Sequence, residues 1–204
     1  MTTEEKRVKK YSAMFAAALK ERGFSDADEK AGEFSGRLTK MYASDAYRKH
    51  NIYPTISTPM VYAVIAMCLT LKPTGLSKNE IIDIVNTAFR SRKKAFGRLV
   101  RAIDRLPFAW SLAKKWNIAD HDGRVRDKSI TYDRFEAADD RVSYKISKCQ
   151  YVEMFDYYGV REYCKIFCMT DTELYSNLTR HVKFIRHSDL SDGDSCNDEV
   201  IKRG

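Results

Sequence analysis

The chain has 204 residues, of which 44% are hydrophobic and 31% are charged, and its formal net charge is +8. This balance is typical of a folded globular protein and excludes an intrinsically disordered chain. The longest apolar run, roughly residues 59–71, is far shorter than the ~20 residues of a membrane-spanning helix, so we expect no membrane partner.

The N-terminal residues and the cysteine count both favour a cytoplasmic protein. The first residues, MTTEEKRVKKYSAMF, carry charges where a signal peptide has its apolar core. Five cysteines cannot all be paired within one chain, and without an export signal we expect free thiols.

Charge is distributed unevenly along the chain. Residues 1–128 carry a net charge of +11, and residues 129–204 carry −3. We therefore expect a helical basic region over 1–128 and an α+β region over 129–204, packed as one compact unit.

The N-terminal part is predicted to be helical. Apolar residues recur at helical spacing in residues 8–19 and 31–42, on either side of Gly23. Residues 60–71 form an apolar run without alternation, which is typical of a buried helix, and Pro73 would close it.

A capping box, in which Ser77 and Glu80 would satisfy each other's backbone N–H groups, is the clearest local signal. It predicts the start of one long amphipathic helix that ends before Pro107. Residues 108–117 are predicted to form a further short helix. The apolar face of the long helix would carry Ile81, Val85, Phe89, Phe96, Leu99 and Ile103.

The pattern changes after Gly123. Residues 129–137 and 141–147 alternate as strands do, and residues 149–178 return to helical spacing with an interruption near Gly159. Residues 182–190 and 195–202 are predicted to be two more strands, joined by a turn. The fold class expected is α+β: a helical N-terminal part followed by a small antiparallel sheet with an embedded helical segment.

Chemically active side chains are concentrated in the last third of the chain. On a helix, Cys164, Cys168 and Asp171 would share one face. Buried cysteines often act only as small hydrophobic residues, but their grouping with a carboxylate favours a functional site. The complete set is Cys149, Cys164, Cys168, Asp171, Arg186, Gly193, Asp194 and Cys196.

Two further interpretations concern metal and anion binding. Four cysteines could ligate zinc, but their spacing lacks the short knuckles of structural zinc sites, so we expect neither a metal nor another cofactor. In the strand pattern, Arg186 follows Phe184 by two and would point to the same side. An inward arginine needs a partner, which is either an internal carboxylate such as Asp171 or a bound anion.

The order of these residues resembles the family of L-2-amino-thiazoline-4-carboxylic acid hydrolases. After the final cysteine that family has an aspartate and then an aromatic residue, whereas this chain has Asn197 and Asp198. The resemblance covers roughly residues 130–204 and rests on Cys149, Gly159, Cys168, Asp171, Phe184, Arg186, Leu190, Gly193, Asp194 and Cys196.

The resemblance implies a hydrolase that opens a small, cyclic, carboxylate-bearing substrate at a C–N/C–S centre and yields an N-carbamoyl amino acid. Water or a thiolate adds to the carbon between nitrogen and sulfur. Cys168 or Cys196 would be the nucleophile, Asp171 the general base or an orienting group, and Arg186 the anchor for the carboxylate. The remaining residues would line the substrate site: Cys149, Cys164, Gly193 and Asp194.

A basic stripe supports an alternative function. Its cations recur every three or four residues along the helix predicted for residues 77–106, and they could bind nucleic acid in a ligand-sensing regulator. A solvated helix face explains the same pattern, and aromatic residues do not interleave with it, so nucleic acid is not the favoured partner. The stripe comprises Arg90, Lys94, Arg98, Arg101 and Arg105.

Overall fold

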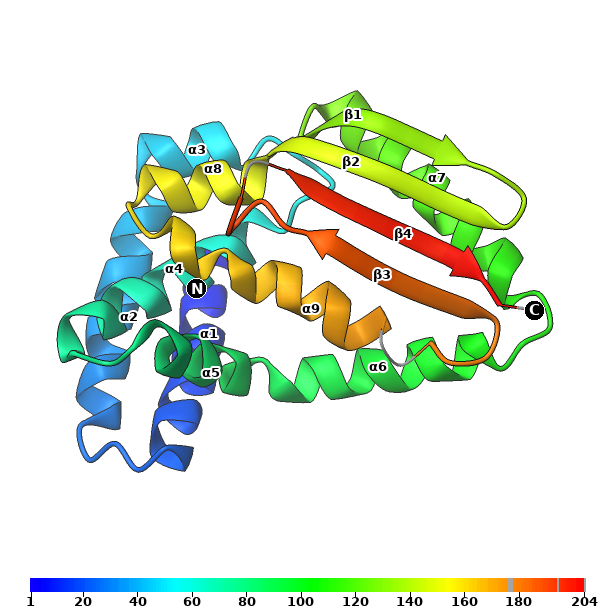
Figure 1. The fold of residues 1–204 in the computed structure, drawn as a ribbon. Coiled ribbons are helices and arrows are strands. Elements are labelled where there is room, and N and C mark those ends of the chain that lie inside the picture. The colour runs from blue at the N-terminus through cyan, green and yellow to red at the C-terminus, as the bar shows by residue number, and fades with distance from the viewer. Residues whose placement is uncertain (176–177, 194, 204) are drawn as a thin grey trace. The chain divides into compact units, whose positions relative to one another are not determined.

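The computed structural model describes residues 1–175, 178–193 and 195–203 (Figure 1). It contains mostly N-terminal helices followed by a four-stranded antiparallel sheet, which confirms the α+β class. The chain forms two compact units: Met1–Arg90 with Glu153–Ile166, and Ser91–Val152 with Phe167–Gly204. This division does not follow the change of charge at residue 128, because residues 91–128 belong with the sheet.

Helices make up the whole of the first unit and a large part of the second. Among the described residues, no helix combines the length and apolar character that crossing a membrane would require. The helices are α1 (Thr3–Glu21), α2 (Ala27–Tyr42), α3 (Asp45–His50), α4 (Thr58–Leu71), α5 (Lys78–Ala88), α6 (Arg90–Asp104), α7 (Ala109–Asp127), α8 (Gln150–Tyr157) and α9 (Lys165–Tyr175), with short 3-10 turns at Lys72–Thr74 and Arg161–Tyr163.

Several local predictions for the first unit are confirmed. Helix α4 is buried on almost every side, as its unbroken apolar run predicts, and the chain after it turns at Gly75 with a positive φ of 79°. At the start of α5, Ser77 N donates to Glu80 Oε2 at 2.8 Å and Glu80 N donates to Ser77 Oγ at 3.3 Å. This is the predicted capping box.

The single long helix predicted after the capping box is wrong, because the chain breaks between α5 and α6. At the break Phe89 has φ −98° and ψ 4°, outside the helical geometry of its neighbours. The break changes which residues of α6 face inward. Val100 is buried, whereas Phe96 and Leu99, predicted for the apolar face, are 44% and 54% exposed.

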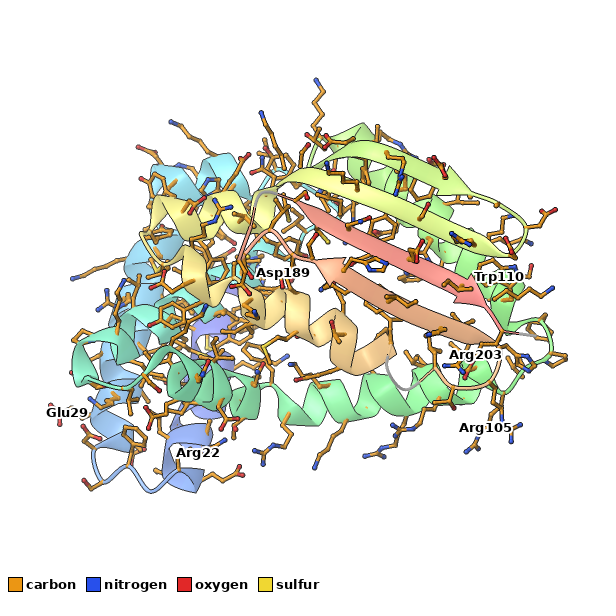
Figure 2. All side chains as sticks on the ribbon, viewed as in Figure 1. Arg22, Glu29, Arg105, Trp110, Asp189 and Arg203 are labelled. Carbon is orange, nitrogen blue, oxygen red and sulfur yellow. The ribbon has the colours of Figure 1, made fainter. Side chains whose placement is uncertain are left out.

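Helix α7 is longer than the short helix predicted around the tryptophans. It continues through Gly123, although a helical glycine costs about 1 kcal/mol relative to alanine. The helix ends at Lys128, which has a left-handed φ of 59°. Trp110 lies near the start of α7 (Figure 2). The indole Nε1 of Trp110 donates to the Asp139 carbonyl at 2.7 Å. Packing of α7 on the sheet therefore overrides the local glycine signal.

The second unit is built on the sheet, whose strand order is β1-β2-β4-β3 (Figure 1). All three neighbouring pairs are antiparallel, and irregularities lie in β1 after Thr131 and near the end of β3 after Arg186. The strands are β1 (Ile130–Ala137), β2 (Arg141–Cys149), β3 (Val182–Ser188) and β4 (Cys196–Lys202).

One face of the sheet, called the inner face below, carries the core of the second unit. Val142, Val200 and Phe184 lie opposite one another on β2, β4 and β3. They share an apolar cluster with Val100 of α6 and Trp110 of α7. Because side chains alternate along a strand, every second residue of β2, β3 and β4 points toward this core.

Candidate active site

The candidate site is a row of side chains across the inner face. The strand register places Phe135, Tyr144, Asp198 and Arg186 opposite one another on β1, β2, β4 and β3. Side chains opposite each other in a sheet interact directly, so the two charged residues of this row meet on neighbouring strands.

Arg186 and Asp198 form a buried, bidentate ion pair. Arg186 Nε donates to Asp198 Oδ1 at 2.9 Å, and Arg186 Nη2 donates to Asp198 Oδ2 at 2.7 Å. The side chain of Asp198 is only 1% exposed and that of Arg186 is 13% exposed. The inward arginine predicted from the strand pattern therefore has an internal carboxylate as its principal partner.

Asp198 is the site residue that the sequence interpretation missed. In the sequence it stands out only as a difference from the family pattern, although it follows Cys196 by two residues and therefore shares its inward side of β4. An aspartate on the buried side of a strand needs a cationic partner, and Arg186 was available. This alternation is the signal that would have revealed it.

Two residues of α9, Cys168 and Asp171, also contact Arg186. Its Nη1 donates to the Cys168 carbonyl, and its Nη2 lies 3.4 Å from Asp171 Oδ2. The Asp171 side chain is 52% exposed, so water reaches this carboxylate. Desolvation by the surrounding protein raises the pKa of the Asp171 carboxyl, and the positive charge of Arg186 opposes that shift.

The thiols near this ion pair are protonated at neutral pH. Burial raises the pKa of Cys168 to about 12, although Arg186 favours the thiolate. Burial also raises the pKa of Cys196, whose Sγ lies 3.4 Å from Asp198 Oδ2. Cys149, at the end of β2, shows the same direction of pKa shift for the same reason. A resting thiolate is therefore disfavoured at all three cysteines.

The structure does not gather every predicted site residue. Cys164 is buried in the first unit, after the 3-10 turn Arg161–Tyr163, whereas Cys149, Cys168 and Cys196 belong to the second. Gly193 is exposed in the turn between β3 and β4, and Asp194 lies outside the described residues.

The predicted turn between β3 and β4 is present, and a side chain stabilises it. Asp189 follows the end of β3 (Figure 2). Its Oδ1 accepts hydrogen bonds from the backbone N of Ser191 at 3.0 Å and of Asp192 at 3.2 Å. This is an Asx turn, in which an aspartate takes the place of a backbone acceptor.

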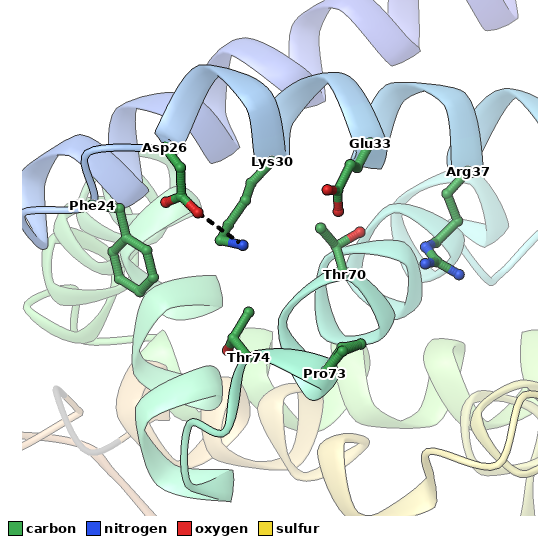
Figure 3. A pocket seen from close by; sticks show the side chains of 8 residues that line it. All are labelled: Phe24, Asp26, Lys30, Glu33, Arg37, Thr70, Pro73 and Thr74. Carbon is green, nitrogen blue, oxygen red and sulfur yellow. Dashed lines mark ion pairs between the residues drawn. The ribbon is translucent and has the colours of Figure 1, made fainter.

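Other candidate features lie elsewhere. Within the described residues, no three histidine, cysteine or acidic side chains are grouped to hold a metal ion. In the first unit, a pocket of about 500 Å³ contains a Lys30–Asp26 ion pair of 3.1 Å (Figure 3). None of the predicted site residues lines it. The pocket is bounded by Phe24, Asp26, Lys30, Glu33, Arg37, Thr70, Pro73 and Thr74.

The basic stripe follows α6 and is mostly exposed. Arg90, the first of its cations, is the last residue of the first unit and is paired with Glu21 at 2.5 Å. The other four cations belong to the second unit and are exposed: Lys94, Arg98, Arg101 and Arg105. A solvated helix face accounts for this arrangement.

Comparison with known protein families gives one match. The family model described as L-2-amino-thiazoline-4-carboxylic acid hydrolase matches residues 57–198, which is more than half of the chain. No curated protein matches the chain. The matched range includes the whole row of the inner face and both helices that follow β2.

Proposed function

The chain belongs to the L-2-amino-thiazoline-4-carboxylic acid hydrolase family, and we propose that it hydrolyses a small cyclic substrate of this type. The ring would carry a carboxylate and a carbon bonded to both nitrogen and sulfur. The product would be an N-carbamoyl amino acid with a free thiol. The aminothiazoline carboxylate named by the family is the first substrate to test.

The observation that carries the proposal is the pairing of an accessible carboxylate with a buried charge network. Asp171 is half exposed and lies 3.4 Å from Arg186, which is itself held by Asp198. A carboxylate that water can reach, in a position fixed by a guanidinium, has the properties of a general base. The rigid Arg186–Asp198 pair supplies that fixed position.

The reaction needs few groups. Asp171 removes a proton from water, and the oxygen forms a bond to the carbon between nitrogen and sulfur. The π bond between this carbon and the ring nitrogen breaks, its electron pair moves to the nitrogen, and the nitrogen takes up the first water proton. The carbon–sulfur bond then breaks with its electron pair remaining on sulfur, the oxygen forms the C=O bond, and the sulfur takes up the second water proton. One water is consumed, the ring opens, and the carbon becomes the carbonyl of the carbamoyl group. The thiol of Cys168 would serve as a hydrogen-bond donor beside the departing sulfur.

Direct attack by water is favoured over attack by a cysteine. A nucleophilic cysteine must first lose its proton, and burial raises the pKa of both Cys168 and Cys196. The Cys196 thiol lies 3.4 Å from Asp198 Oδ2, and both oxygens of that carboxylate already accept hydrogen bonds from Arg186. Among the described residues, no histidine is hydrogen-bonded to either thiol, so neither thiol has an imidazole in place to accept its proton.

The two routes differ in their response to cysteine substitution. Purified protein is mixed with 2-aminothiazoline-4-carboxylate, and N-carbamoyl-cysteine is measured by mass spectrometry. We expect the unaltered chain to form this product, and we expect Cys168→Ser and Cys196→Ser to keep kcat within about tenfold. Loss of kcat by several orders of magnitude in either variant would instead identify that thiol as the nucleophile. No product from the unaltered chain would contradict the proposed substrate.

A further inference from the structure

A second arginine of the sheet unit, Arg124, lies on the side of α7 that packs against the sheet. Trp110 and Ala113 of the same helix contribute to the core of the inner face. His121 stacks on Phe135 with ring centroids 3.8 Å apart. Arg124 follows His121 by three residues, so it continues this stripe toward the end of the helix.

The guanidinium of Arg124 has a buried nitrogen, Nη1, for which the described residues supply no acceptor. Nε donates to Asp120 Oδ2 at 2.6 Å, one turn earlier on α7. The Arg124 side chain is only 18% exposed, and its Nη1 is buried without a hydrogen-bond partner among the described residues. Buried donors are nearly always satisfied, and an unpaired charged donor is costly, so this nitrogen requires an acceptor.

Arg124 interacts with two tyrosines on neighbouring elements. Its charge opposes the effect of burial on the pKa values of Tyr132 on β1 and Tyr151 on α8. It acts in the same sense on Cys149 and on Asp171, whose pKa values burial raises. Arg124 is therefore within electrostatic reach of the proposed base, and the phenol rings supply flat apolar surfaces on which a small ring can pack.

The two arginines near Asp171 are not equivalent. Arg186 has both carboxylate oxygens of Asp198, the Cys168 carbonyl and Asp171 as acceptors. Arg124 has the Asp120 carboxylate and the Tyr151 hydroxyl as partners, and its Nη1 is left without an acceptor among the described residues. A guanidinium N–H that lacks an acceptor is suited to a carboxylate oxygen.

We propose that Arg124 binds the carboxylate of a small cyclic substrate, with Nη1 as the buried donor, and that Arg186 serves to position Asp171. This inference rests on the proposed hydrolase function for its substrate class. It reverses the role expected for Arg186 from the sequence. The ligand is a five-membered ring with a carboxylate on the carbon next to nitrogen, packed against Tyr132 and Tyr151.

The test measures binding rather than turnover. The probe is thiazolidine-4-carboxylate, which keeps the ring and the carboxylate but lacks the amidine carbon that is attacked. Its affinity is measured by titration calorimetry with the unaltered protein, Arg124→Gln, Arg124→Lys and the control Arg126→Gln. Arg126 is an exposed arginine on the same helix. The methyl ester of the probe is titrated in parallel.

We expect Arg124→Gln to weaken binding of the carboxylate at least about tenfold and to leave the weaker binding of the ester unchanged. Arg124→Lys should lose part of the affinity, because it keeps the charge without the planar fork. Arg126→Gln should bind as the unaltered chain does. Because the lysine variant keeps a cation beside Asp120, it remains informative if the glutamine variant fails to fold.

Three results would overturn the inference: no binding of the probe to the unaltered protein, equal affinity in the Arg124 variants, or equal losses for the carboxylate and the ester. Turnover distinguishes this inference from the proposed function. Normal hydrolysis with unchanged KM in Arg124→Gln would contradict the carboxylate-binding role of Arg124 and leave the hydrolase function supported. Arg124-dependent binding without hydrolysis would support the carboxylate site and contradict the proposed reaction.

Discussion

The carboxylate of Asp198 is buried, and its principal partner is Arg186. Two charge-assisted hydrogen bonds join them, and the Asp198 side chain is 1% exposed. Removing one member of a buried pair leaves the other charge uncompensated, which costs more than the pair contributes. The pair is therefore a strong constraint on β3 and β4 and a support for Asp171.

The substitution Asp198→Asn should lower the free energy of unfolding by about 3–5 kcal/mol, because it leaves the Arg186 charge buried without its counterion. Urea denaturation measures this change. Glu199→Gln, on the outward side of the same strand, is the matched control and should cost less than about 1 kcal/mol. A loss in Asp198→Asn no larger than in the control would show that the pair is not buried in solution.

The residue scale also shows what the sequence could predict. The period of two along β3 correctly predicted an inward Arg186, and the same period along β4 would have predicted Asp198. Arg124 is not among the predicted site residues, because the short helix predicted for residues 108–117 ends before it. In the structure α7 continues to residue 127 and carries Arg124 on its sheet-facing side. The glycine penalty of about 1 kcal/mol is smaller than what packing contributes.

At the scale of elements, the end of α6 is tied to the segment before β3. The buried carboxylate of Asp104 accepts hydrogen bonds from the backbone N atoms of Thr179, Arg180 and His181, at 2.6, 2.7 and 3.0 Å. Burial alone would raise the pKa of Asp104, but these backbone donors lower it further than burial raises it. The Asp104 carboxylate thus accepts hydrogen bonds from three backbone N–H groups that precede β3.

This tie should make stability depend on pH in the acid range. Because the pKa of Asp104 is lower in the folded state, its contribution is complete above the unfolded value of about 3.9 and is lost as pH falls through the folded pKa. Asp104→Asn should cost about 1.5–3 kcal/mol at pH 7 and less at pH 2–3. Thermal unfolding at both pH values measures this, and an equal loss at both would contradict the assignment.

Elements with strong local signals were predicted well, and elements decided by packing were not. The capping box of α5, the apolar run of α4 and the four alternating strands all have local causes, and all are present. The break at Phe89 has no proline or glycine to announce it. It nevertheless changes the phase of α6 and exposes Phe96 and Leu99. Tertiary packing, which the sequence does not display, decides such breaks.

At the scale of the whole molecule, the exposed cations of the basic stripe and the candidate active site lie on different surfaces of the second unit. The cations of α6 are exposed, whereas the candidate site lies on the inner face of the sheet. A hydrolase needs no nucleic acid, so the stripe is expected to keep the protein solvated. The regulator interpretation would instead make it the binding surface.

Replacing Lys94, Arg98 and Arg101 together by glutamate separates these two functions. We expect the triple variant to retain its fold and its rate of ring opening, because no residue of the candidate site is changed. Circular dichroism and product formation measure both. Salt-sensitive, sequence-selective DNA binding by the unaltered chain, abolished in the variant, would favour the regulator.

The most direct test of the hydrolase assignment is the kcat for ring opening of 2-aminothiazoline-4-carboxylate by Asp171→Asn. Glu173→Gln is the control, since Glu173 lies on the same helix and pairs with Lys93 at 2.9 Å. We predict that kcat falls at least about a hundredfold in Asp171→Asn and stays unchanged in Glu173→Gln. In the unaltered protein the acid limb of the rate profile should lie above the ordinary aspartate range, because the pKa of Asp171 is raised. Equal kcat values in Asp171→Asn and the unaltered chain would contradict the account.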